Sequence, residues 1–142
     1  TSGVVNAGGD LCAWGEKSRE NAWTIGIQDP DDKGNVLMSI PARDCAIVTS
    51  GNYEKYVTIN EVEYCHIIHP KTGWPARNLK SVTIICPNAE LADGLATSVF
   101  ILGSSEGMAL VNRLEGVEAI IIDDSNHLFF SNNIQSNYAA SN

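Results

Sequence analysis

The chain contains no long hydrophobic run and few basic residues. No apolar stretch approaches the roughly 18 residues that a membrane-crossing helix needs, and the first residues lack the pattern of a secretory signal. Nine Lys and Arg stand against 17 Asp and Glu, which gives a net charge of -8. Such an acidic surface repels phosphate backbones and anionic lipids, so we expect neither nucleic acid nor a membrane surface as a direct partner.

Cysteine and aromatic residues are also sparse. Aromatic residues make up 7% of the chain, and the four cysteines, Cys12, Cys45, Cys65 and Cys86, contain no C-x-x-C pair. Nothing therefore suggests a zinc ribbon or a dithiol redox couple, and we expect buried free thiols. Hydrophobic residues at 44% and charged residues at 18% are typical of a globular chain, and 142 residues suit one domain.

Short strand patterns occupy most of the sequence. The stretches "WTIGI" and "VLMSI" alternate apolar and polar residues on either side of the turn sequence "DPDDKGN", which predicts a β-hairpin. Further strands are predicted at Val4 and Val5, at "CAIVT", at 56–59, at 63–68, at "SVTIIC", at "VEAIIID" and at "HLFF". No internal repeat is visible.

Two consecutive helices interrupt these strands. Pro87 and Asn88 provide a stop and an N-cap, and apolar residues then recur at helical spacing at Leu91, Leu95, Val99 and Leu102. Gly103 ends the first helix, and a serine begins the second. This order predicts an α+β fold, an antiparallel sheet with two consecutive helices packed on it. We expect residues 1–130 to form the folded portion and residues 131–142 a loosely held polar tail.

Asp93 and Thr97 are candidate metal ligands. They are four residues apart in the first predicted helix and therefore share one face. Carboxylate and hydroxyl oxygens suit magnesium, which leaves its other positions to water or to phosphate. From the spacing alone a purely structural role is favoured, because an aspartate favours a helix N-terminus, a threonine bonds back to a carbonyl one turn earlier, and such pairs are common by accident.

His66 is the candidate general base. It lies at the end of a predicted strand, before a turn that contains Pro70, Thr72 and Gly73. An imidazole that titrates at about pH 6.5 can accept a hydroxyl proton at neutral pH. Two alternatives stay open: a structural histidine, and a zinc ligand shared with His69 and an unidentified third residue.

Two glycine-bearing loops could offer backbone N–H groups to a phosphate. They are "NAGGD", Asn6 to Asp10, and "TSG", Thr49 to Gly51. Neither is a P-loop or a dinucleotide fingerprint, and such glycines also mark ordinary strand ends.

The ordered series of motifs resembles a known family. The stretches "VVNAGGD", "WTIGIQDP", "AIVTSGNYEKY", "YCHIIHPKTGWPA", "SVTIICPNAELADGLATSVFILG" and "VEAIIID" resemble the C-terminal half of the FAD:protein FMN transferases, also called the ApbE or thiamine biosynthesis lipoprotein family. The resemblance covers about residues 4 to 123, and the series is far more specific than any single motif.

The resemblance implies a magnesium-dependent transfer of the FMN half of FAD to a threonine of an acceptor flavoprotein, with release of AMP. It implies that His66 of the H-x-x-x-P-x-T-G motif is the general base and that Asp93 and Thr97 are side-chain metal ligands. It places the flavin nucleotide site at Asn6, Gly8, Gly9, Asp10, Thr49, Ser50, Gly51, His66, Pro70, Thr72 and Gly73.

Two departures from the family pattern lead to alternative interpretations. His69 stands where the family usually carries aspartate, and the N-terminal half of the family is absent, so we expect a fragment with an incomplete pocket. The alternatives are a flavin-binding module without transfer activity and a magnesium-dependent FAD pyrophosphatase. Thr97 in "DGLAT" has a second candidate role as an acceptor of FMN, but we prefer the metal-ligand role, because a helical threonine that faces its own site is poorly presented to another enzyme. By analogy we expect an extracytoplasmic protein whose membrane contact is an upstream lipid anchor.

Overall fold

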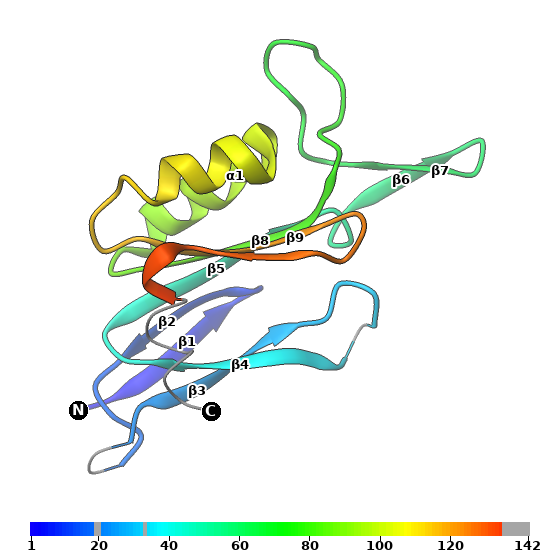
Figure 1. Ribbon diagram of the computed structural model, residues 1–142. Helices are drawn as coiled ribbons and strands as arrows, with labels where there is room; N and C mark the ends of the chain where they lie inside the picture. The colour runs from blue at the N-terminus through cyan, green and yellow to red at the C-terminus, as the bar shows by residue number, and fades with distance from the viewer. Residues whose placement is uncertain (19–20, 33, 135–142) are drawn as a thin grey trace.

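A six-stranded antiparallel sheet forms the centre of the computed structural model, which describes residues 1–18, 21–32 and 34–134 (Figure 1). The strand order is β1-β2-β5-β8-β9-β10. The strands are β1 (Gly3–Ala7), β2 (Asp10–Trp14), β5 (Cys45–Gly51), β8 (Leu79–Cys86), β9 (Glu118–Asp123) and β10 (Leu128–Phe130). The predicted α+β fold is confirmed.

The central sheet is covered on both faces. Helix α1 (Ala89–Val111) lies on one face, and the predicted hairpin, β3 (Trp23–Gln28) with β4 (Val36–Ala42), lies on the other (Figure 1). Successive side chains of a strand point to opposite faces. Ala46 and Val48 therefore join the core beneath α1, whereas Ile47 joins the core beneath the hairpin.

Helix α1 consists of two helical segments joined at Gly103. Gly103 has φ 84° and ψ 175°, which is not helical, so the two predicted consecutive helices are confirmed. The side chain of Asn88 accepts a hydrogen bond from Leu91 N at 2.8 Å, as expected of an N-cap. α1 has the length and hydropathy of a membrane-crossing helix, but the break leaves two segments that are each shorter than the roughly 20 residues required.

The buried face of α1 does not coincide with the apolar stripe at helical spacing. In that stripe Leu91 is 49% exposed and Leu102 is 41% exposed. The fully buried residues are Ala92, Ala96, Val99, Phe100 and Val111. Small alanines let the helix axis approach β5 and β8 closely, which is why the alanine face, and not the leucine face, meets the sheet.

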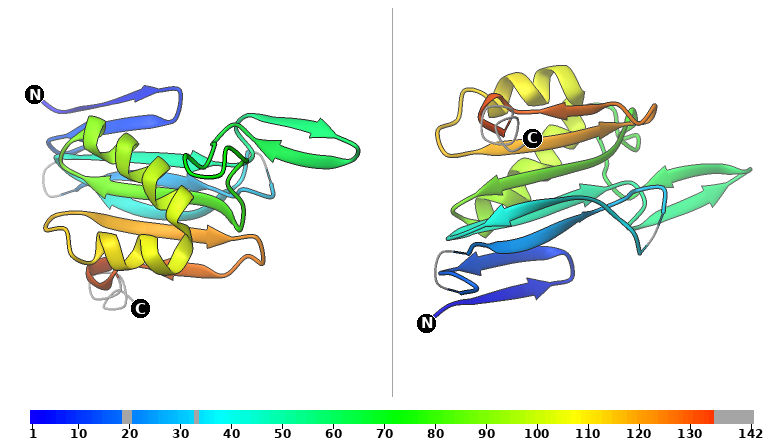
Figure 2. Two further views of the ribbon diagram at one scale, coloured as in Figure 1. Left: turned by 90° about the horizontal axis from the view of Figure 1, so that it is seen from above. Right: turned by 60° about the horizontal axis from the view of Figure 1, so that its bottom comes forward.

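A second hairpin, β6 (Tyr56–Ile59) with β7 (Val62–Cys65), projects from the body of the molecule (Figure 2). The strand predicted over 63–68 ends earlier, at Cys65. Beyond it the backbone closes its own loop, in which Ala76 N donates to Ile67 O at 2.8 Å. This loop between β7 and β8 carries His66 and the residues that follow it.

Several other expectations concern the cysteines and the C-terminal segment. All four cysteines are free, but only Cys65 and Cys86 are buried, whereas Cys12 and Cys45 are partly exposed. Ser131 and Ile134 are each 2% exposed, so the beginning of the segment predicted as a tail packs on the core. Residues 135–142 lie outside the described residues.

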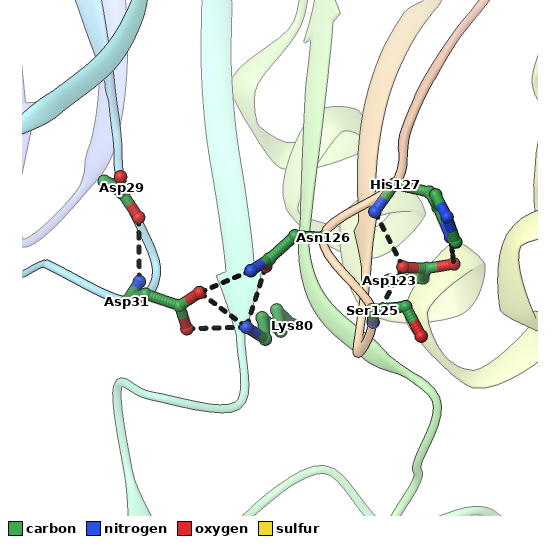
Figure 3. A network of polar contacts seen from close by, with 7 residues as sticks. All are labelled: Asp29, Asp31, Lys80, Asp123, Ser125, Asn126 and His127. Atoms are coloured by element: carbon green, nitrogen blue, oxygen red, sulfur yellow. Dashed lines mark hydrogen bonds and ion pairs between the residues drawn. The ribbon is translucent and has the colours of Figure 1, made fainter.

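A polar network joins the β3–β4 turn to the central sheet. Lys80 Nζ, from β8, lies 2.6 Å from each carboxylate oxygen of Asp31 and donates to Asn126 Oδ1 at 2.7 Å (Figure 3). Asn126 Nδ2 also donates to Asp31 at 2.9 Å. Asn126 lies in the β9–β10 turn, so the network connects three segments that are far apart in sequence.

Candidate active site

The β1–β2 turn places Asp10 at the start of β2. Gly8 and Gly9 form the two-residue turn with φ of 71° and 115°, a conformation that disfavours any residue with a Cβ. The Asn6 side chain accepts from Gly9 N at 2.9 Å and so fixes the turn. The sequence "NAGGD" thus builds a tight hairpin that presents the exposed carboxylate of Asp10.

The "TSG" segment divides between the two faces of the sheet. Ser50 is 9% exposed, and its hydroxyl oxygen lies 3.3 Å from Oγ1 of Thr97 on α1. Thr49 points to the opposite face, where its hydroxyl lies 2.8 Å from that of Thr83. The ring of Tyr53 occupies the space beside Gly51, whose hypothetical Cβ would lie 2.6 Å from it. Of the two hydroxyls, only that of Ser50 joins the Asp93–Thr97 face of the helix.

The carboxylates of Asp10 and Asp93 are electrostatic neighbours. Partial burial, and then the negative charge of Asp93, raise the pKa of the Asp10 carboxyl. Two carboxylates that repel one another in this way favour a cation between them, because a positive charge offsets both. Asp93 of α1 thus acts on Asp10 of β2 through its charge, and Thr97 of α1 contacts Ser50 of β5 at 3.3 Å.

The oxygen atoms of Asp10, Asp93 and Thr97 are of the chemical type that magnesium prefers. Among the described residues, no three His, Cys, Asp or Glu side chains form a group that could hold a metal ion by themselves, and His66 with His69 gains no third ligand there. Asp93 and Thr97 instead offer one carboxylate and one hydroxyl, and the charge of Asp93 acts on Asp10. Magnesium accepts such a small set of hard oxygen ligands when water or phosphate completes its coordination.

His66 is held by the backbone of the neighbouring loop. The backbone N of His66 lies 3.1 Å from the carbonyl oxygen of Lys55, and the ring Nδ1 of His66 lies 3.0 Å from the same oxygen. A carbonyl oxygen only accepts, so Nδ1 carries a hydrogen and donates. In the neutral ring Nε2 then keeps its lone pair, and the exposed side chain can take up a proton there.

Glu54 is a charged neighbour of this histidine. Partial burial raises the pKa of the Glu54 carboxyl, His66 lowers it, and Asp10 raises it again. Glu54 therefore lies within electrostatic reach of both the candidate base and Asp10. No motif marks it, because a lone glutamate in a loop has no distinctive spacing.

The loop that follows His66 is fastened by its own hydrogen bonds. His69 N donates to Trp74 O at 2.8 Å, and Gly73 N donates to His69 O at 2.9 Å. Thr72 Oγ1 accepts from Trp74 N at 3.3 Å, so its hydroxyl serves the turn. Gly73 has φ 72°, and Pro70 stiffens the bend. The motif residues after His66 thus shape the loop.

His69 keeps a local contact that an aspartate would make. Its Nδ1 accepts from Lys71 N at 3.2 Å, the pattern of an Asx turn, in which a carboxylate accepts from the backbone two residues later. The imidazole therefore substitutes for the carboxylate in shaping the turn, although it brings no negative charge.

The model of the ApbE family matches residues 1–121. The chain therefore belongs to the ApbE family. Among curated relatives, the FAD:protein FMN transferase of Treponema pallidum is 38% identical over 131 residues, which cover 85% of this chain and 36% of that protein. The enzyme of the same name from Salmonella typhimurium is 36% identical over 121 residues, which cover 84% of this chain and 34% of that protein.

Solved structures agree with this assignment. The ApbE protein of Thermotoga maritima is 34% identical and superposes with a TM-score of 0.86, over 95% of this chain and 44% of that one. The flavin transferase ApbE of Vibrio cholerae is 29% identical with a TM-score of 0.76, over 94% of this chain and 43% of that one. The chain spans about a third of the length of the curated relatives named above.

Proposed function

We propose that the protein is an FAD:protein FMN transferase, which moves the FMN half of FAD to a threonine hydroxyl of an acceptor flavoprotein and releases AMP in a magnesium-dependent reaction. The observation that carries this proposal is the bond from Nδ1 of His66 to the Lys55 carbonyl, because it leaves Nε2 able to accept the threonine proton. Family membership supports the same reaction class.

The residues of the chain suit the individual steps. Nε2 of His66 takes the proton of the attacking threonine, whose oxygen forms a bond to the phosphorus of the FMN half. The bond from that phosphorus to the bridging oxygen breaks, and AMP leaves with the electron pair. Asp93 and Thr97 would hold magnesium, which offsets the negative charge of the diphosphate when it is bound. Glu54 favours the protonated imidazole that forms during attack.

Hydrolysis of FAD is a second candidate reaction. His66 is exposed, so water can reach the same nitrogen and replace the threonine as the nucleophile. The products would then be FMN and AMP without any covalent flavin.

A single incubation separates these reactions. The full-length protein is mixed with FAD, magnesium and a threonine-containing acceptor, and covalent flavin is followed by in-gel fluorescence while AMP is measured by chromatography. Covalent flavin with an equal amount of AMP supports transfer, and AMP alone supports hydrolysis. If the protein binds FAD but forms neither product, it is a flavin-binding module without transfer activity.

The variant His66→Ala tests the assigned base. Base catalysis contributes about 100-fold to 10,000-fold, so the transfer rate should fall by that factor while FAD affinity stays within about twofold. His127→Ala is the matched control, since it removes another exposed imidazole in the β9–β10 turn. Unchanged transfer by the His66 variant would remove this residue from the mechanism.

A further inference from the structure

Ser50 is a polar residue in the otherwise apolar row that β5 turns toward α1. Ala46 and Val48 precede it at every second position and are buried beneath the helix. Ser50 itself is only 9% exposed, and a buried hydroxyl needs a hydrogen-bonding partner. Among the residues that the structure describes, the side chain of Ser50 has one such partner, Oγ1 of Thr97 at 3.3 Å. The strand thus directs this hydroxyl at a candidate metal ligand.

Thr97 does not form the hydrogen bond that a helical threonine commonly forms. A serine or threonine within a helix often donates to the carbonyl oxygen one turn earlier. Ser98 does so, because its Oγ donates to Gly94 O at 2.7 Å. In the described part of the chain, the hydroxyl of Thr97 has no such bond to Asp93 O and lies against Ser50 instead. The hydroxyl of Thr97 is therefore held by the sheet and is not taken up by its own helix.

The two hydroxyls of this pair have more hydrogen-bonding capacity than their contact uses. Each carries one hydrogen and two lone pairs, and only one hydrogen can lie between the two oxygen atoms. If Thr97 donates, its oxygen keeps its lone pairs. If Ser50 donates, one lone pair of Thr97 is used and the hydrogen of Thr97 points elsewhere. A cation binds a hydroxyl oxygen through a lone pair and repels its hydrogen, so it favours the arrangement in which Thr97 donates.

We propose that Ser50 is a positioning residue, which accepts the hydroxyl hydrogen of Thr97 and so keeps the lone pairs of Thr97 available to a divalent cation. The inference rests on the proposed function, since it deepens the metal-ligand role of Thr97. Ser50 acts through Thr97 and does not itself bind the cation. Without Ser50, the hydroxyl of Thr97 is free to rotate and bond back to Asp93 O, as Ser98 does with Gly94 O.

Titration of the full-length protein with Mn²⁺ alone tests this proposal. Mn²⁺ binds to the same kinds of oxygen ligand as magnesium, and binding removes the electron paramagnetic resonance signal of the free ion. Loss of a residue that orients a metal ligand typically costs 10-fold to 100-fold in metal affinity, so Ser50→Ala should weaken Mn²⁺ binding by about tenfold or more. Ser50→Thr keeps an acceptor oxygen and should restore most of the affinity.

Ser98→Ala is the matched control for the loss of a serine hydroxyl. Its hydroxyl bonds to the helix backbone, so this variant should bind Mn²⁺ as the wild type does. Thr97→Val supplies the second background, because it removes the hydroxyl through which Ser50 acts. Ser50→Ala should weaken Mn²⁺ binding in the wild type but have no further effect in Thr97→Val. A merely structural loss would appear in both backgrounds and would not be restored by Ser50→Thr.

Three results would overturn the proposal: a wild type that does not bind Mn²⁺, equal affinities in Ser50→Ala and the wild type, or an equal loss with and without the Thr97 hydroxyl. Mn²⁺ binding is measured without FAD and without an acceptor, so it stands apart from transfer. Failure of the proposed function appears as absence of covalent flavin in the wild type, whatever the Mn²⁺ affinities are.

Discussion

At the scale of single residues, His69 shows how one side chain can form the hydrogen bond that a different side chain would form. Its Nδ1 accepts from Lys71 N, so it closes the turn that an aspartate would close. We expect His69→Asp to keep the thermal midpoint within experimental error and His69→Ala to lower stability by about 1 kcal/mol, the net contribution of one hydrogen bond. Thermal unfolding of both variants measures this. Equal destabilisation by Asp and Ala would show that the imidazole ring, and not its acceptor atom, supports the loop.

Some residue-level features of the site were readable from the sequence and others were not. The alternation of side chains along a strand predicts that Thr49 and Ser50 point to opposite faces, so only one hydroxyl of "TSG" can meet the helix. The contact between His66 and a backbone carbonyl was not readable, because every residue carries the same carbonyl and sequence gives no signal of which one is near. Glu54 was missed for a similar reason.

At the scale of elements, the two segments of α1 pack closely against each other. A Cβ on Gly107 would lie 2.7 Å from Val99 Cγ1 and 3.1 Å from Val99 O. Gly107→Ala should therefore lower the free energy of unfolding by about 1–3 kcal/mol, the usual cost of overpacking. Urea unfolding of the variant and the wild type measures this change in the free energy of unfolding. Gly94→Ala is the control, because a Cβ there meets nothing within 4 Å, and it should stabilise by about 0.5–1 kcal/mol. Equal effects at both sites would contradict the close contact.

The same helix shows where sequence periodicity fails. The β3–β4 hairpin, the N-cap at Asn88 and the break at Gly103 all have local causes, and each was predicted. The buried face was not, because large apolar residues at helical spacing, such as Leu91 and Leu102, and small ones, such as Ala92 and Ala96, form two competing stripes. Which stripe meets the sheet depends on how near the helix lies to β5 and β8, and that distance is a property of the assembled core.

At the scale of the whole molecule, the network around Lys80 ties the β3–β4 turn to the sheet. Hydrogen bonds from Lys80, and then from Asn126, lower the pKa of the Asp31 carboxyl below its usual 3.8. A carboxyl whose pKa is lower in the folded state contributes stability above its unfolded pKa and loses it as the pH falls through the folded value. The contribution of Asp31 is therefore complete at neutral pH and disappears below pH 3.8.

The variant Asp31→Asn should test this linkage through its pH dependence. Its thermal midpoint should lie below that of the wild type at neutral pH. The two midpoints should converge as the pH falls from 3.8 through the lower folded-state pKa of Asp31, because the wild-type carboxyl then becomes protonated in the folded protein. Removal of a negative charge from a chain of -8 also relieves general repulsion. Glu115→Gln controls for that, since Glu115 is exposed and forms no ion pair among the described residues. If the difference in thermal midpoint between Asp31→Asn and the wild type does not change as the pH falls through 3.8 and below, the ion pair with Lys80 does not stabilise the fold.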